Sequence, residues 1–185
     1  YIPYLLLSVL CYVLGNILSA FHKGDVPKRM QASPISGQRQ NLEALLAAGG
    51  LGIVLWIICI LGGIFFYGRE LLESGGFVYY LLNSLTMLPV SLSLSYLVGI
   101  LTSNPEALSG VVNTLSLGMC FLCGVFVPLD ILSTKVKTAA QFLPVYWYEK
   151  ANDTIAEFEN ITGGVKTEIW QAMGIQLVFA AAILC

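Results

Sequence analysis

Charged residues are scarce in this chain. They make up 11% of its 185 residues, whereas a soluble domain has about 25%. Hydrophobic residues make up 57%, and the mean hydropathy is +0.79. No basic stripe indicates nucleic-acid binding. The composition therefore predicts an integral membrane protein with no nucleic-acid partner.

Groups for acid–base chemistry are equally scarce. The single histidine, His22, stands beside Lys23 at the edge of an uncharged stretch, where a loop residue is a better interpretation than a general base. No Asp or Glu lies inside the long uncharged stretches, although proton- and sodium-coupled carriers usually need such a group there. The chain also lacks the Gly-x-x-x-x-Gly-Lys-Ser/Thr loop that holds ATP phosphates. We predict no catalytic residue, and we expect the energy for any transport to enter through a partner.

The five cysteines all fall in apolar runs. Cys120 and Cys123 have the spacing of a metal or redox motif, but no His or further Cys lies nearby to complete a zinc site. We interpret both as small packing residues. No metal or cofactor is predicted in this chain.

Five uncharged stretches are long enough, or nearly so, to cross a membrane. A charge at the centre of a spanning helix costs roughly 2.5–3.5 kcal/mol, so this absence is physically meaningful. Only helices and closed barrels satisfy the backbone in lipid, and runs of this length without alternation favour helices. We predict an all-α membrane protein, a polytopic bundle of five transmembrane helices forming one domain over residues 1–185. The expected spans are about 1–21, 44–68, 77–101, 107–128 and 168–185. Because Tyr1 is not a Met and no charged tail follows the last span, we expect the chain to be a fragment of a longer protein.

Basic residues predict the orientation. The loop 22–43 has the highest density of Lys and Arg, which places it in the cytoplasm and region 129–167 outside. Aromatic residues gather at the ends assigned outside, as an interfacial belt would: Tyr1, Tyr4, Tyr67, Tyr79, Tyr80, Trp147, Tyr148 and Trp170. We therefore expect a multi-pass protein of the plasma membrane.

Small residues recur every four positions in two of the predicted spans. One ridge is Ser91, Ser95, Gly99 and Ser103, and the other is Gly110, Thr114 and Gly118. Such ridges let helix backbones approach closely. We favour packing within the chain over a substrate-lining role for both.

The segment between Pro128 and Pro144 is neither a membrane span nor an ordinary loop. Its apolar residues recur at helical spacing with polar residues between them. At about 1.5 Å per residue its interior reaches about 22 Å, short of a ~30 Å hydrocarbon core. We predict a re-entrant amphipathic helical segment, Leu129–Leu143, before the last span.

The loop 22–43 carries signals for helix starts. Asp25 and Pro27 suit one start, and Ser33-Pro34 suits a second. We expect a short helix over Val26–Ala32, then a break, then a helix that feeds the second span. A short basic helix on the cytoplasmic face is either a docking element for a protein or an anchor on lipid head groups.

Together these elements resemble the permease subunit of type-2 ABC exporters. One matching stretch places Arg29 a few residues before Ser33-Pro34. The other has Gly124 and Pro128 closing the penultimate span, Asp130 two residues later, and Leu143-Pro144 before Tyr146. Asp130 stands where the family commonly has Glu, and Ser133 stands where it commonly has Pro.

The resemblance implies a membrane permease without an ATP site. Its partners would be an ATP-binding cassette subunit, which holds ATP and Mg²⁺, and a second permease copy or homologue in a dimer. It also implies two sites, whose residues are named here as expectations. The loop 22–43 would dock the ATPase subunit through Lys28, Arg29, Ser33 and Pro34. The re-entrant segment would close the outer end of the pathway with Gly124, Pro128, Asp130 and Pro144.

Two other functions stay open at this stage. A non-ABC secondary carrier or membrane enzyme would need buried ionisable or catalytic groups outside this chain. A structural or lipid-binding scaffold would rest on the basic loop and small-residue ridges alone. No residue discriminates among possible cargoes.

Overall fold

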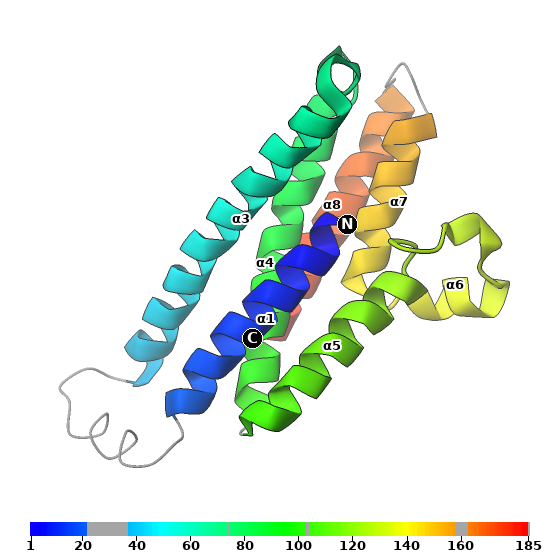
Figure 1. The fold of residues 1–185 in the computed structure, drawn as a ribbon. Coiled ribbons are helices and arrows are strands. Elements are labelled where there is room, and N and C mark those ends of the chain that lie inside the picture. The colour runs from blue at the N-terminus through cyan, green and yellow to red at the C-terminus, as the bar shows by residue number, and fades with distance from the viewer. Residues whose placement is uncertain (22–36, 74, 103, 158–162, 185) are drawn as a thin grey trace.

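The computed structural model describes residues 1–21, 37–73, 75–102, 104–157 and 163–184, and these are helical with short connections. The elements are α1 (Ile2–Phe21), α3 (Gly37–Glu73), α4 (Phe77–Leu101), α5 (Pro105–Leu122), the 3₁₀ turn η1 (Leu129–Ile131), α6 (Thr134–Ala140), α7 (Pro144–Glu157) and α8 (Gly163–Leu184). The long helices lie side by side in an elongated bundle (Figure 1). We call the end where α3 ends and α4 begins the upper end, and the end where α4 ends and α5 begins the lower end. The helical bundle confirms the predicted fold class.

Helix α4 forms the centre of the bundle. It packs against α1 over its largest interface and also against α3, α7 and α8. The small-residue ridge of α4 makes this close packing with α1 possible. Gly99 lies so near α1 that a Cβ there would stand 2.6 Å from Leu18 Cδ1 and 3.3 Å from the Gly15 Cα. Ser91 and Ser95 of the same ridge are fully buried, as the sequence predicted.

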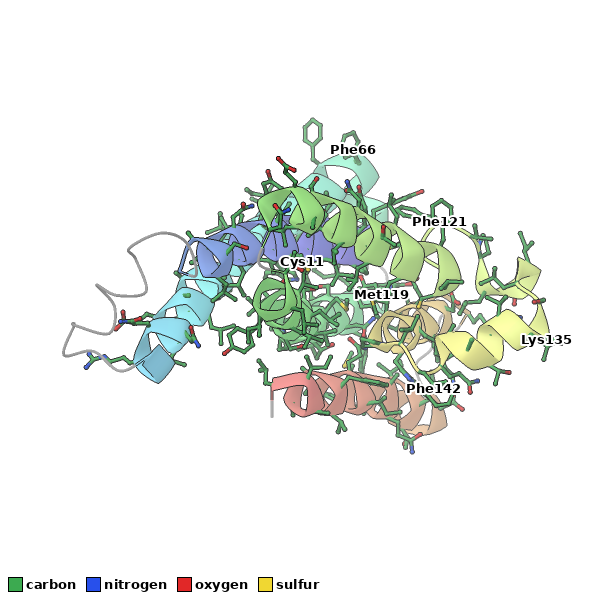
Figure 2. The ribbon with its side chains drawn as sticks, turned by 90° about the horizontal axis from the view of Figure 1, so that it is seen from below. Cys11, Phe66, Met119, Phe121, Lys135 and Phe142 are labelled. Atoms are coloured by element: carbon green, nitrogen blue, oxygen red, sulfur yellow. The ribbon has the colours of Figure 1, made fainter. Side chains whose placement is uncertain are left out.

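The largest apolar core cluster connects α1, α4, α5 and α7 through buried side chains such as Leu7, Met87, Met119 and Val145. Cys123 belongs to this cluster, and Cys120 is buried as well, which agrees with their interpretation as packing residues. Seen from below, Cys11 lies in the interior while Phe66 projects from the periphery (Figure 2). Large apolar side chains cover the outer face of α3, as expected for a helix that faces lipid.

Among the described residues, four helices are long and apolar enough to cross a membrane, namely α1, α3, α4 and α8. Helix α5 is shorter, because it ends at Leu122 rather than near the predicted residue 128. Helix α3 is longer than the predicted span 44–68 and includes a non-helical residue, Gly68 with φ 55°. Helix α3 is longer because it continues past the apolar stretch into charged residues. Near its N-terminal end, Arg39 and Glu43 form an i,i+4 ion pair at 3.3 Å.

The second predicted ridge does not pack against any part of the chain that the structure describes. A Cβ added at Gly110 or Gly118 would meet nothing within 4 Å, and Thr114 is exposed. The interpretation as an intramolecular packing ridge is therefore wrong for α5. Periodicity identifies a smooth helix face, but it does not say which helix, if any, covers it.

Candidate functional site

Helix α5 ends in a sharp turn at Gly124. The backbone there has φ +101°, a conformation that residues with a side chain rarely adopt. The Val125 and Phe126 amides both donate to the Cys120 carbonyl, at 3.0 and 3.3 Å, which closes the last turn of α5. A Cβ on Gly124 would lie 2.7 Å from Leu129 Cγ. The predicted gate residue Gly124 thus sits where both the dihedral angle and the space require glycine.

The segment that follows is broken rather than one continuous amphipathic helix. It comprises η1, then an extended link at Leu132 and Ser133, then α6. Ser133 has φ −62° and ψ 151°, the extended conformation that residues before a helix usually have, and this interrupts the predicted helix Leu129–Leu143. Two other predicted gate residues, Pro128 and Asp130, are exposed in this segment. Helix α6 lies beside the bundle near its mid-height, with Lys135 pointing away from the other helices (Figures 1 and 2).

Pro144 starts α7, which returns the chain toward the upper end of the bundle (Figure 1). Pro144 is buried, and Val145, Tyr148, Ala151 and Ile155 continue the buried face at helical spacing. This face packs against α8 and α4. Of the four predicted gate residues, Gly124 and Pro144 therefore bracket the turn and Pro144 anchors it in the core.

A cluster of hydrogen-bonded amides fastens α7 to α4 and α8. The Asn83 Nδ2 group donates to the Tyr148 carbonyl and to Asn152 Oδ1, each at 2.9 Å. Gln176 Nε2 donates to Asn83 Oδ1, also at 2.9 Å. The Thr86 hydroxyl lies 3.0 Å from Gln176 Oε1 and 2.7 Å from the Asn83 carbonyl, and can donate to one of them at a time. We call Asn83, Thr86, Asn152 and Gln176 the amide cluster.

The amide cluster is the main feature that sequence reasoning missed. Asn83 and Gln176 are both completely buried. Neither carries a formal charge, so a search for uncharged stretches does not distinguish them from their apolar neighbours. The available signal was that an amide in a predicted span needs a partner, since polar groups in lipid seek hydrogen bonds in the bundle.

A groove of about 340 Å³ separates part of α1 from α5. Polar side chains on both walls distinguish it from the apolar core: Ser8 and Tyr12 on α1, and Ser109 and Asn113 on α5. These α5 residues belong to the same exposed surface as the unpacked ridge. Such convergent polar groups in an apolar setting are typical of ligand-binding surfaces.

The predicted docking residues lie outside the described residues. Lys28, Arg29, Ser33 and Pro34, together with the expected helix Val26–Ala32, all fall within 22–36. Their docking role therefore stays a prediction.

Comparison with known families decides the assignment. The family described as ABC-2 family transporter protein matches residues 1–185, the whole chain. This chain belongs to the ABC-2 transporter family. It matches no curated protein and no solved structure.

As an ABC-2 membrane domain, the chain is the permease component of an ABC transporter and not itself a catalytic domain. The family implies a multi-pass membrane protein that associates with an ATP-binding subunit. The resemblance drawn from the motifs around Ser33-Pro34 and Gly124–Pro144 is thereby confirmed at the level of the family.

A partly buried carboxyl on α7 predicts a pH dependence for this ABC-2 permease. Burial raises the pKa of Glu149 from 4.5 to about 7, with a further rise from the Asp153 charge. Because the folded-state pKa is the higher one, the stabilisation is complete below about pH 4.5 and is lost as the pH rises through 7. Glu149→Gln should therefore unfold at a higher temperature than wild type at pH 8, by an amount equivalent to about 2 kcal/mol, and at a similar temperature at pH 4.5. Thermal unfolding in detergent at both pH values measures this. An equal effect at the two values would contradict it.

Proposed function

We propose that this permease exports its cargo across the plasma membrane using ATP hydrolysed by a separate ATP-binding cassette subunit. The observation that carries the proposal is the polar groove between α1 and α5 in a chain of the ABC-2 family. It offers hydrogen-bonding groups to a cargo within an otherwise apolar bundle. ATP and Mg²⁺ would be held by the partner, since the chain lacks the phosphate-binding loop.

The open face of α5 suits a second permease copy or homologue. Its small residues, Gly110, Thr114 and Gly118, would let a facing helix approach closely. In such a dimer the two grooves would face one another and enclose a shared pathway. Asn113 lies at the border between the groove and this face, so it would contact the cargo or the second copy.

The α5–α7 turn would close the outer end of that pathway. Gly124 permits the turn, Pro128 starts η1, and buried Pro144 fixes the return into α7. Asp130 is exposed and would present a charge to the outside. The proposal puts region 22–43 in the cytoplasm, where Lys28, Arg29, Ser33 and Pro34 would dock the ATPase subunit.

Charge reversal in the loop tests the proposal. The variant Lys28→Glu with Arg29→Glu should abolish ATP-dependent transport in reconstituted vesicles. It should also reduce transport-stimulated ATP hydrolysis by at least about tenfold. A docking surface that attracts Lys28 and Arg29 carries negative charge, so it would repel glutamates at these two positions. Lys135→Glu with Lys137→Glu on α6 is the matched control, since it reverses two charges at the other predicted face.

Normal stimulated ATP hydrolysis in the loop variant would exclude the docking role. Cargo movement driven by an ion gradient, with no ATP and no ATPase subunit in the vesicles, would instead support a secondary carrier and overturn the proposal.

A further inference from the structure

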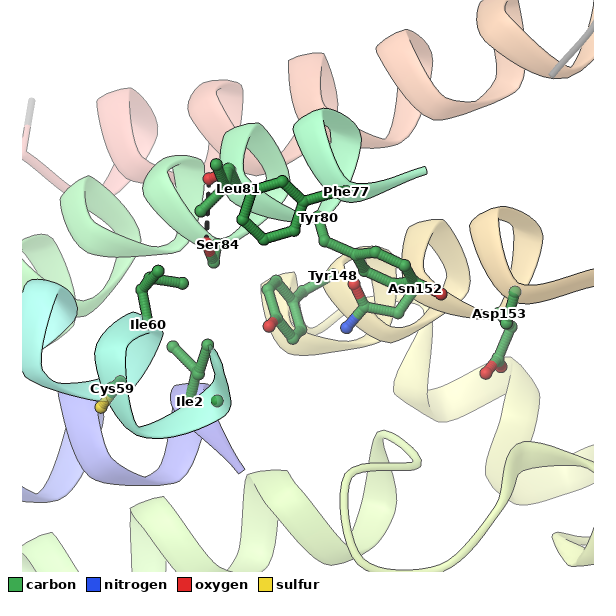
Figure 3. A pocket seen from close by; sticks show the side chains of 12 residues that line it. Ile2, Cys59, Ile60, Phe77, Tyr80, Leu81, Ser84, Tyr148, Asn152 and Asp153 are labelled. Carbon is green, nitrogen blue, oxygen red and sulfur yellow. Dashed lines mark hydrogen bonds between the residues drawn. The ribbon is translucent and has the colours of Figure 1, made fainter. Parts of the chain in front are cut away.

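A second cavity lies on the other side of the bundle, among α3, α4 and α7. Its volume is about 340 Å³, and it is separate from the groove between α1 and α5, with which it shares no residue. Ile2, Cys59, Ile60 and Leu81 form an apolar wall, and Ser84 and Asn152 contribute polar groups. Figure 3 shows these side chains converging on a common space. The volume lies in the range of pockets that hold small molecules.

Aromatic rings make up much of the remaining lining. Phe77, Tyr80 and Tyr148 all border the cavity, and Tyr148 is nearly fully buried. The faces of such rings attract organic cations, above all in desolvated sites. A set of three rings beside a long apolar wall is therefore suited to a molecule with a cationic head and an alkyl chain.

The lining of the cavity includes a negative charge. Asp153 lines it and is exposed, and it lies to one side of the aromatic rings in Figure 3. Although most of its surface is exposed, partial burial raises the pKa of Asp153, and the charges of Asp130 and Glu157 raise it further. Three carboxylates therefore share this region. Glu149 also senses the Asp153 charge.

No described lysine or arginine forms an ion pair with this group of carboxylates. The ion pair found among the described residues joins Arg39 and Glu43 on α3. Lys150, the cation nearest in sequence to Asp153, has its Nζ 5.3 Å from the centre of the Trp147 ring. Among the described residues, no cation therefore competes with an outside cation for the Asp153 carboxylate.

We propose that the α3–α4–α7 cavity binds a single-chain cationic amphiphile from the surrounding bilayer, with its ammonium head at Asp153 and the aromatic rings and its alkyl chain along Ile60 and Leu81. The site goes beyond the proposed export function, because it lies outside the α1–α5 groove. Its occupancy requires neither ATP nor cargo. An anionic amphiphile would be repelled by the carboxylates, and an uncharged one would gain only the apolar contacts.

Equilibrium binding to the full-length protein in nanodiscs tests the site. The probe is radiolabelled dodecyltrimethylammonium below its micellar concentration, with empty nanodiscs as the background and dodecyl sulfate and dodecyl maltoside as competitors. Wild type should bind the cation saturably and prefer it to both competitors. Asp153→Asn should weaken binding about tenfold. Glu168→Gln also replaces a carboxylate by an amide, but at an exposed site on α8, and it should leave binding unchanged.

A second variant tests the apolar wall independently. Ile60→Trp places a larger side chain in the cavity from α3, and it should reduce binding of the probe without changing the charge. The proposal is overturned if Asp153→Asn and Glu168→Gln behave alike, if dodecyl maltoside competes as well as unlabelled dodecyltrimethylammonium, or if Ile60→Trp binds as wild type does. Because the assay contains no nucleotide, its result is independent of whether export is ATP-driven.

Discussion

Asn83→Leu should detach α7 from the bundle core. The substitution keeps the size of the side chain roughly constant but removes three hydrogen bonds, to the Tyr148 carbonyl, Asn152 and Gln176. At an average of about 0.6 kcal/mol for an interhelical hydrogen bond in a membrane protein, the loss is about 2 kcal/mol. The Gln176 Nε2 group adds to this cost, because it loses its acceptor on Asn83 in a completely buried position that solvent does not reach. Thermal unfolding in detergent should show the drop, and transport should fall with it.

Hydrogen exchange makes this prediction specific to α7. Peptides covering residues 144–157 should exchange faster in the variant, whereas peptides from α5 should change little, since α5 makes few contacts with α7. Gln176→Leu should have a similar but smaller effect because it breaks fewer bonds. Gln171→Leu is its matched control on the same helix, at an exposed position. If Gln176→Leu were no more destabilising than Gln171→Leu, the bonds from Gln176 to Asn83 and Thr86 would not stabilise the fold.

Pairwise coupling gives a further check. In Asn83→Leu with Gln176→Leu, neither amide is left to strand the other, so the double variant should lose less stability than the sum of the two single variants. Additive losses would mean that the two side chains stabilise the fold separately. That result would contradict the network as the structure has it.

The amide cluster shows where sequence reasoning reaches its limit. The uncharged stretches predict where the long apolar helices lie, because the cost of burying a charge in lipid acts on each residue separately. Asn83 and Gln176 are 93 residues apart in the sequence, and they stabilise the fold through the hydrogen bond between them. A hydropathy profile registers each as a small local decrease. The pairing depends on which helices are neighbours, and that information is absent from local patterns.

The two ridges of small residues also show that a local pattern does not reveal which helices are neighbours. The ridges of α4 and α5 have the same period, yet α1 covers the first and nothing in the described chain covers Gly110 or Gly118 of the second. The pattern correctly identifies a face that permits close approach. Whether that face meets a helix of the same chain is decided by the bundle as a whole. The open ridge is consistent with our proposal of a second permease copy.

For the segment between Pro128 and Pro144, the sequence predicted an interruption between long helices but not its shape. Its short length and its flanking prolines predicted a re-entrant piece, and α6 does lie beside the bundle with α7 returning from it. The break at Leu132 and Ser133 was missed, since apolar spacing alone cannot distinguish one amphipathic helix from two short helical pieces with an extended link. Gly124 was selected through the family resemblance, and the structure supplies its physical reason.

Gly124→Ala should destabilise the α5–α7 turn by about 1–3 kcal/mol. An alanine at φ +101° is strained in itself, and its Cβ would stand 2.7 Å from Leu129 Cγ. Gly118→Ala is the matched control on α5, because that site is helical and has nothing within 4 Å of the added carbon. There the same substitution should be neutral or stabilising by up to about 1 kcal/mol. Unfolding temperatures of the two variants should therefore move apart.

A double variant separates the two causes at Gly124. In Gly124→Ala with Leu129→Ala, the collision with Leu129 is removed while the unfavourable dihedral angle remains. If the clash dominates, stability relative to Leu129→Ala alone should recover. If backbone strain dominates, the cost of Gly124→Ala should be the same with either residue at position 129. We expect most of the cost to persist, because the Leu129 side chain can rotate away from the added carbon, whereas the positive φ is part of the turn that brings the Val125 amide to the Cys120 carbonyl. A Gly124→Ala variant as stable as Gly118→Ala would show that the turn does not need this conformation and that its role in closing the pathway lies elsewhere.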